Sequence, residues 1–184
     1  MGAGLNPAQA TGPRPRLLYL VGGVGNAERV DVSDLFAERL GRHRFAIDWV
    51  VYAAEPGPAW QRTCWRGAPA CIVGRAPVSP RGRGLGAAMR DKLREIGADL
   101  RTAGLILRGD YDLVQVRDKF VVAVLALLAC RWRGCQFVYW MSYPFAECRI
   151  QDAREGRARW PWLSRVGGRL AAWLLYRVIL PGAD

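Results

Sequence analysis

The chain has 184 residues, of which 51% are hydrophobic, so it is long and apolar enough to bury the core of one domain. Lysine and arginine number 27 against 16 acidic residues, and the net charge of +11 indicates an anionic partner: nucleic acid, a phospholipid surface or a phosphorylated small molecule. One histidine and five cysteines without C-x-x-C spacing argue against Ser/His/Asp catalysis, a His-rich metal centre and a zinc or redox motif.

The first fifteen residues are rich in glycine and proline and lack the apolar segment of a secretory signal. We therefore predict a disordered leader over 1–15 and a single domain over 16–184. No apolar run reaches the roughly 18 residues of a membrane span. Free cysteines fit a reducing compartment, so the sequence predicts a cytoplasmic protein.

A strongly apolar strand is predicted over 16–23, and a glycine-rich turn follows at Gly22, Gly23 and Gly25. An amphipathic helix over 31–40 comes next. Such a turn lets a phosphate or sugar approach backbone N–H groups at the helix start. The pattern completes neither the dinucleotide fingerprint nor a P-loop, so a binding loop and a plain tight turn both remain open.

A second strand is predicted over 45–54, followed by a proline-rich irregular region over 55–80 that contains one short strand. The basic RGRG segment at 81–84 is either a solvated turn or a phosphate contact. A long helix is predicted over 85–107. Five apolar residues at helical spacing are expected to form its buried stripe: Met89, Leu93, Ile96, Leu100 and Leu107.

The centre of the chain is a predicted βαβ unit, with strands over 112–116 and 136–141 and an apolar helix over 120–130 between them. Polar residues follow both strands. Because open parallel sheets bind ligands at the carboxyl ends of their strands, these residues are candidate site residues. They are Arg117, Asp118 and Lys119 after the first strand and Ser142 and Tyr143 after the second.

The last quarter of the chain is predicted as a charged, mobile loop over 146–159 and a tryptophan-rich helix over 160–180. Arginines lie on one side of this helix and apolar residues on the other. It either rests in an anionic membrane surface or covers the sheet. The final segment, VILPGAD, has the character of a strand that leads into a turn.

The order of these elements predicts an α/β protein, a Rossmann-like three-layer sandwich with a mostly parallel sheet. Three segments carry a resemblance to a known family: LLYLVGGVGNAERV, YDLVQVRDKFVVAVLALLACRWRGCQFVYWMSYPF, and the closing helix that ends in VILPGAD. The chain resembles the N-terminal Rossmann-like domain of GT-B glycosyltransferases of the family-4-like kind. The resemblance implies that this domain is a single GT-B half that binds the acceptor. A second domain, which we expect to be missing from these 184 residues, would bind the nucleotide-sugar.

The resemblance also implies roles for individual residues, and for each of them a structural role in capping the next helix competes. Asp118 is the catalytic candidate, holding an acceptor hydroxyl or, in an inverting reaction, acting as general base; the resemblance indicates a retaining reaction. The glycines at 22, 23 and 25 would face the donor phosphates. The remaining candidates would bind an acceptor such as a lipid-linked pyrophosphate sugar: Arg117, Lys119, Ser142, Tyr143 and Glu147.

The functional hypothesis is therefore the acceptor half of a nucleotide-sugar-dependent transferase, without a cofactor, acting in glycolipid or polysaccharide synthesis at the inner face of the plasma membrane. It would be inactive without a donor domain or a separate donor chain. The alternative is a non-catalytic, membrane-associated subunit that recruits a catalytic chain. A flavodoxin-like nucleotide-binding module is a third reading. Nucleic-acid binding is disfavoured, because the aromatic residues lie in apolar segments.

Overall fold

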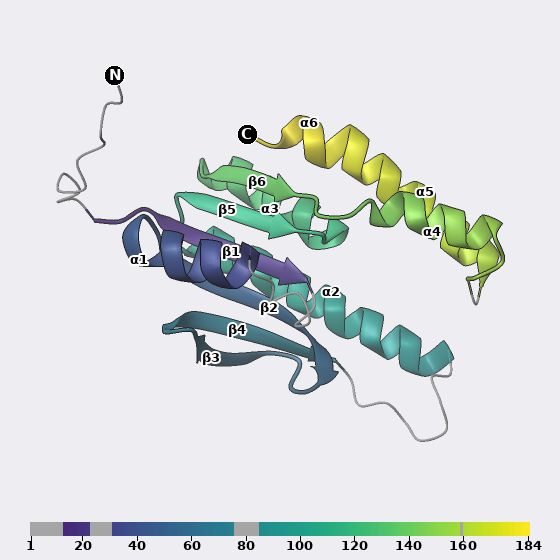
Figure 1. Ribbon diagram of the computed structural model, residues 1–184, viewed down its shortest axis with the longest axis horizontal. Coiled ribbons are helices and arrows are strands. Elements are labelled where there is room, and N and C mark those ends of the chain that lie inside the picture. The colour runs from purple at the N-terminus through teal and green to yellow at the C-terminus, as the bar shows by residue number, and fades with distance from the viewer. Residues whose placement is uncertain (1–12, 23–30, 76–84, 159) are drawn as a thin grey trace.

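A computed structural model of the chain describes residues 13–22, 31–75, 85–158 and 160–184. A six-stranded sheet forms its centre, in the order β3-β4-β2-β1-β5-β6 (Figure 1). Every neighbouring pair is parallel except β3 with β4. The strands are β1 (Arg16–Gly22), β2 (Ala46–Pro56), β3 (Gln61–Trp65), β4 (Ala68–Arg75), β5 (Leu113–Arg117) and β6 (Gln136–Trp140).

Helices cover both faces of the sheet, which confirms the predicted Rossmann-like three-layer α/β fold. On one face lie η2 (Asp31–Leu40) and α1 (Gly41–His43); on the other lie α2 (Leu85–Arg108) and α3 (Phe120–Arg133) (Figure 1). The chain then forms α4 (Phe145–Arg154) and one continuous helical run. This run consists of α5 (Pro161–Leu174), η3 (Leu175–Ile179) and α6 (Leu180–Gly182).

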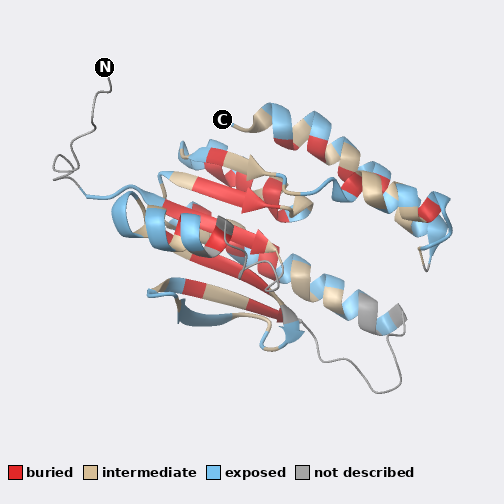
Figure 2. Ribbon diagram, viewed as in Figure 1, coloured by how far each residue is buried: buried red, intermediate tan, exposed pale blue. Residues whose placement is uncertain are grey.

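Two apolar cores lie on opposite faces of the sheet because side chains alternate along each strand. In β1, Leu18 and Leu20 belong to the core under α2, α3 and η3, whereas Leu17, Tyr19 and Val21 belong to the core under η2. Both sides of this central strand are buried, as a parallel strand between helical layers requires (Figure 2).

The predicted βαβ unit is confirmed. β5 and β6 are parallel, with Arg117 opposite Trp140 at their carboxyl ends. Gly134 ends the connecting helix α3 in the left-handed conformation, with φ of 74°, and its N–H donates to the carbonyl oxygen of Cys130. Glycine adopts this conformation without a Cβ clash. His43 is exposed at the end of α1.

The region predicted to be irregular contains an antiparallel hairpin of β3 and β4. Its turn residues Arg66 and Gly67 have φ of 49° and 77°, the left-handed pair that a tight hairpin needs. The short strand predicted in this region, over 70–76, corresponds to β4. The sequence did not predict β3, for two reasons. Arginine is unusual at a positive φ, and four of the five β3 residues are exposed, so the strand has no apolar alternation.

Two predictions for the C-terminal part were wrong. Most of the charged loop predicted over 146–159 is α4, which buries only Ala146 and Ala153 and so has little apolar periodicity. Likewise, VILPGAD is helical as far as Gly182 rather than extended. Ile179 of this segment is fully buried in the core under α3, which favours continuing the helix.

The predicted leader over 1–15 falls mainly on residues 1–12, which lie outside the described part of the chain. Pro15 and Arg14, however, take part in the fold. The Arg14 guanidinium donates to the carbonyl oxygens of Gly41 (3.0 Å) and Arg42 (2.9 Å), and the N–H of Ala46 donates to the carbonyl of Pro15 (3.0 Å). The ordered domain thus includes residues before β1.

The predicted orientation of the long helix is also wrong, although its boundaries are correct. All five residues of the predicted buried stripe are exposed, from 43% for Ile96 to 65% for Leu93. The opposite face packs on the sheet and consists of Ala98, Asp99, Thr102 and Ile106. Within the described residues, no helix has the length and apolar character needed to cross a bilayer.

Candidate functional site

A pocket of about 720 Å³ lies at the carboxyl ends of the parallel strands. The N-terminal half of α2 and the α4–α5 pair extend beyond these strand ends in Figure 1, and both line the pocket. The sheet side contributes Gly22, Tyr52, Asp118 and Lys119. The helical side contributes Lys92, Glu95, Ile96 and Asp99 from α2, Phe145 and Arg149 from α4, and Leu170 and Leu174 from α5.

Lys119 is the central cation of this pocket. It precedes α3, and its ammonium forms an ion pair with Glu95 of α2. The same ammonium lies 4.0 Å from the ring centroid of Tyr52, within the range of a cation–π interaction. Gly22 makes room for the lysine stem, because a Cβ at residue 22 would lie only 3.3 Å from Lys119 Cγ. The side chain is thereby held between β1, β2 and α2.

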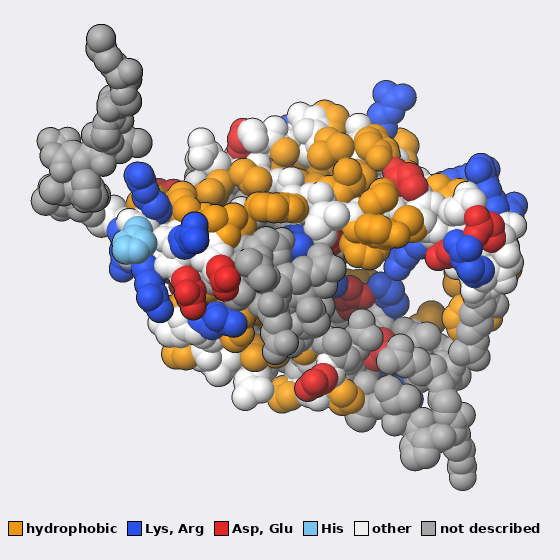
Figure 3. All heavy atoms as spheres, viewed as in Figure 1, with side chains coloured by type: hydrophobic (Ala, Val, Ile, Leu, Met, Phe, Trp, Pro, Cys, Tyr) orange, Lys and Arg blue, Asp and Glu red, His pale blue; other side chains and the backbone are white. Residues whose placement is uncertain are grey.

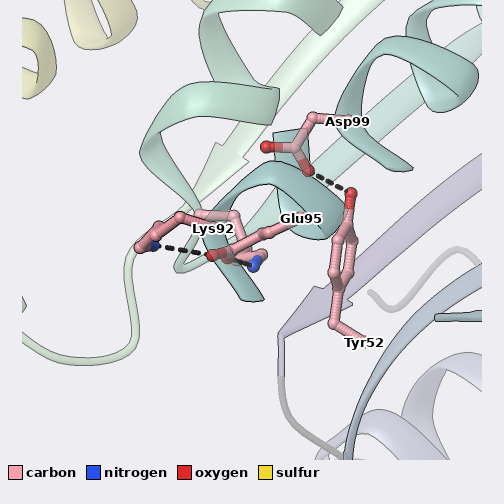
Figure 4. Close-up of polar contacts among 5 residues, drawn as sticks. Tyr52, Lys92, Glu95 and Asp99 are labelled. Atoms are coloured by element: carbon pink, nitrogen blue, oxygen red, sulfur yellow. Dashed lines mark hydrogen bonds and ion pairs between the residues drawn. The ribbon is translucent and has the colours of Figure 1, made fainter. Parts of the chain in front are cut away.

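Glu95 is bridged by two lysines, since Lys92 Nζ also lies 2.6 Å from its other carboxylate oxygen (Figure 4). Burial alone would raise the pKa of Glu95, but the charges and hydrogen bonds of Lys119 and Lys92 lower it to about 2. Glu95 is therefore ionised at neutral pH.

A buried hydrogen bond joins Tyr52 to Asp99 beside this ion pair. The Tyr52 hydroxyl donates to Asp99 Oδ1 at 2.5 Å, and Figure 4 shows the two side chains pointing toward one another across the floor of the pocket. Burial raises the pKa of Tyr52, and the neighbouring Asp99 raises it further. Burial also raises the pKa of Asp99, although the hydrogen bond from Tyr52 opposes this. The phenol thus keeps its proton and acts as the donor.

Asp118 links the ends of β5 and β6. Its Oδ1 accepts a hydrogen bond from the Ser142 N–H at 2.8 Å, and its Oδ2 accepts one from the Ser142 hydroxyl. Arg117 Nε lies 3.5 Å from the same Oδ2. The backbone of Asp118 is left-handed, with φ of 56°, a conformation that aspartate tolerates better than most residues. Each carboxylate oxygen therefore has a partner within the fold.

The structure brings together only some of the sequence-predicted site residues. Gly22, Asp118 and Lys119 line the pocket, and Ser142 is bonded to Asp118. Arg117 is 1% exposed, with its guanidinium 5.9 Å from the Trp140 ring centroid, so it supports Asp118 from within the protein.

The remaining predicted residues lie elsewhere. Tyr143 is half-exposed and does not line the pocket; its ring meets the Phe145 ring edge to face, with centroids 5.1 Å apart. Glu147 accepts a hydrogen bond from the Tyr176 hydroxyl at 2.6 Å and so ties α4 to η3. Gly23 and Gly25 lie outside the described residues, and the predicted glycine loop remains a prediction.

Sequence reasoning missed seven polar residues of the pocket: Tyr52, Asp91, Lys92, Arg94, Glu95, Asp99 and Arg149. A signal for three of them was present. Lys92, Glu95 and Asp99 are spaced three and four residues apart and so lie on one face of α2. The apolar residues on the opposite face of α2 led to the expectation that this polar face is exposed.

The pocket suits a polar ligand that carries both hydroxyls and a negative charge. Its carboxylates can accept hydrogen bonds from hydroxyls, and Lys119, Lys92 and Arg149 can pair with a phosphate or pyrophosphate. Across the described ranges, no cluster of three or more His, Cys, Asp or Glu side chains could hold a metal ion.

Comparison with known proteins adds little to this geometry. No family model matches the chain, and no curated protein matches it. Two crystal structures of the C-terminal domain of the PF1911 hydrogenase from Pyrococcus furiosus are similar, each with a TM-score of 0.46. Their identities are 12% and 11%; the matches cover 69% and 73% of this chain and 93% and 100% of those domains. Likeness at this level carries no functional argument.

Proposed function

We propose that this chain is the acceptor-binding half of a nucleotide-sugar-dependent glycosyltransferase that makes a glycolipid or polysaccharide. One observation carries the proposal: a pocket at the carboxyl edge of a Rossmann-like sheet combines the Lys119 ammonium with buried carboxylates and a tyrosine. Sugar hydroxyls pair with carboxylates and a phosphate pairs with ammonium groups, so the pocket has chemistry for both parts of a glycosyl phosphate.

In this proposal Lys119 binds the acceptor phosphate. An incoming phosphate would replace Glu95 as the partner of the ammonium, and Glu95 would remain paired with Lys92. Asp118 orients Ser142 and the strand ends, and its negative charge is available to an acceptor hydroxyl that displaces the serine. Transfer itself requires a donor-binding domain or a separate donor chain, and a retaining outcome follows from the resemblance.

The test is titration of the isotope-labelled chain with short-chain polyprenyl-pyrophosphate-linked glycosides and with free glycosides, followed by NMR. We expect shifts at Lys119, Tyr52 and Asp99, and at least a tenfold loss of affinity in Lys119→Ala, because a hydrogen bond to a charged group contributes about 1.5–3 kcal/mol. Arg62→Ala on exposed β3 removes the same charge outside the pocket and should not affect binding. Binding of FMN or NAD in place of every glycoside would favour a nucleotide-binding module and contradict the proposal.

A non-catalytic, membrane-associated subunit is the second candidate function. The observation that favours it is the exposure of Trp162 (70%) and Trp173 (56%) on α5, with Arg165 and Arg169 exposed on the same helix. Tryptophan and arginine are common in helices that lie on anionic membranes. A chain that binds vesicles but no glycoside would favour this function over the first.

A further inference from the structure

We propose that one complete side of the molecule binds the surface of an anionic phospholipid bilayer. This side is the outward surface of α2, α3 and the run α5–η3–α6, and we call it the outer helical surface. The proposal goes beyond the acceptor pocket, because most of the residues on which it depends, such as Leu93, Leu100 and Trp162, neither line the pocket nor belong to the two apolar cores.

Exposed apolar side chains are concentrated on the outer helical surface. Fifteen large hydrophobic residues with at least 40% exposure lie there, whereas η2 on the opposite face exposes only Leu35 among its described residues. The fifteen are Met89, Leu93, Ile96, Leu100 and Leu107 of α2; Val121, Leu128 and Trp132 of α3; and Trp162, Leu163, Val166, Leu170, Trp173, Tyr176 and Leu180 of the closing run. Such a concentration marks a binding surface rather than the scatter of single apolar residues that every protein exposes.

The exposed charged side chains of these helices have one sign. Their exposed charged residues are all basic: Arg90, Lys92, Arg101, Arg108, Arg131, Arg133, Arg165, Arg169 and Arg177. The described carboxylates of α2 are Asp91, Glu95 and Asp99, which all line the pocket, and α3 and the closing run carry no acidic residue. In contrast, η2 exposes both Asp34 and Glu38 beside Arg39.

Apolar side chains together with arginines and no exposed carboxylate are what an anionic bilayer surface binds best. The apolar side chains enter the boundary between headgroups and acyl chains, tryptophans favour that boundary, and long arginine side chains reach the lipid phosphates. The helices form one continuous surface, because α3 contacts both α2 and η3. Figure 3 views the molecule from the side of η2, so of this surface it shows only the upper edge, where the closing run lies in Figure 1 and where hydrophobic side chains are visible.

The pocket opens on this same surface. Ile96, Val121 and Leu170 are exposed residues of the outer helical surface, and all three also line the pocket. A bilayer held against these helices would therefore cover the mouth, and an amphiphilic ligand could place its head group beside Lys119 while its chain stays in the lipid.

The experiment is co-sedimentation of the full chain with vesicles of phosphatidylcholine, with and without phosphatidylglycerol. We expect binding to the anionic vesicles that weakens as salt rises. Leu93→Ser/Leu100→Ser should reduce binding at least tenfold, whereas Leu35→Ser removes a leucine from the opposite face without effect. Arg101→Glu/Arg108→Glu should reduce binding roughly 25-fold or more, from about fivefold per lost charge. Arg39→Glu is the matched control.

Thermal unfolding of each variant shows whether it is folded, and these substitutions are at exposed positions. Two results would overturn the proposal. The first is equal loss of vesicle binding in the matched controls. The second is that the parent chain does not bind vesicles and instead forms a dimer in sedimentation velocity that Leu93→Ser/Leu100→Ser abolishes. A second copy of the chain would then occupy the surface. Lys119→Ala should leave vesicle binding intact, so failure of the acceptor proposal is seen separately.

Discussion

Asp99 and Tyr52 meet in the floor of the pocket, where each satisfies the other. The Tyr52 hydroxyl donates a hydrogen bond to the Asp99 carboxylate, and Asp99 is only 2% exposed. The two residues are 47 positions apart in the sequence. A buried carboxylate without a donor is unfavourable by several times the net contribution of one hydrogen bond. The pair therefore fixes α2 against β2 through a polar contact, beside the apolar contacts of Ala98 and Ile106 in the same core.

Tyr52→Phe is expected to destabilise the protein by about 1–3 kcal/mol at pH 7, because it leaves the Asp99 carboxylate without this donor. The pKa of Asp99 is already raised by burial, and losing the hydrogen bond raises it further. A raised native pKa means that stability falls as pH rises through it. The difference between parent and variant should thus be larger at pH 7 than near pH 4 in urea unfolding. Tyr176→Phe, which loses a bond to Glu147 near the surface, is the control; an equal and pH-independent loss in both would contradict the argument.

Glu95 should give the opposite pH dependence. Its native pKa is lowered to about 2 by Lys119 and Lys92 in spite of burial, so the stability it contributes is present above its ordinary value of 4.5 and is lost as pH falls toward 2. We expect Glu95→Gln to flatten the decline of the unfolding free energy between pH 4.5 and pH 2.5. Glu38→Gln, an exposed glutamate on η2, should leave the slope unchanged. Equal slopes in the parent and Glu95→Gln would contradict the assigned ion pairs.

At the scale of elements, the apolar pattern of α2 predicted the length of the helix correctly but predicted the wrong face to pack on the sheet. Helical spacing of Leu93, Ile96 and Leu100 establishes an amphipathic helix, but it does not say which side faces the sheet. The sheet presents Tyr52 and Lys119 at its carboxyl edge, and these pair with Asp99 and Glu95 of the other side. Such partners come from distant parts of the chain, so local periodicity could not reveal them.

The α4–α5 contact depends on a single glycine. A Cβ at Gly168 would lie 2.7 Å from Ile150 Cγ1 and 3.1 Å from the Ala146 carbonyl oxygen, whereas a Cβ at neighbouring Gly167 would meet nothing within 4 Å. We expect Gly168→Ala to destabilise the protein by about 1–3 kcal/mol through overpacking. Gly167→Ala should stabilise it by up to about 1 kcal/mol through helix propensity. Thermal unfolding of the two variants checks this, and changes of the same sign in both would contradict the close packing.

At the scale of the whole molecule, the sequence predicted the layers, the central βαβ unit and the edge of the sheet at which a pocket forms. Asp118 and Lys119 were predicted at that edge because they directly follow a buried strand, and both line the pocket. The strand β3 with its pairing to β4, the helix α4 and the acidic floor of the pocket were not predicted. Each of them depends on contacts between distant segments or on exposed residues with no periodic pattern.

The two sides of the molecule should also differ in how their tryptophans respond to lipid. If the outer helical surface binds anionic vesicles, brominated acyl chains should quench part of the fluorescence, because bromine quenches tryptophan at short range. Trp132→Phe/Trp162→Phe/Trp173→Phe should remove most of the quenchable fraction, because all three tryptophans are exposed on this surface. Trp65 lies on the hairpin in edge-to-face contact with Trp49, so Trp65→Phe should leave the quenchable fraction unchanged. Equal quenching in both variants would place lipid contact elsewhere.

The outer stripe of α2 also has a consequence for how this sequence can diverge. Leu93, Ile96 and Leu100 lie outside both apolar cores, so the stability of the fold does not require a hydrophobic residue at these positions. Ordinary mutational drift in related genes should therefore replace them with polar residues, as it does at other exposed helix positions. If related sequences keep apolar residues at these three positions while the exposed residues of η2 vary freely, natural selection has acted on binding rather than on folding.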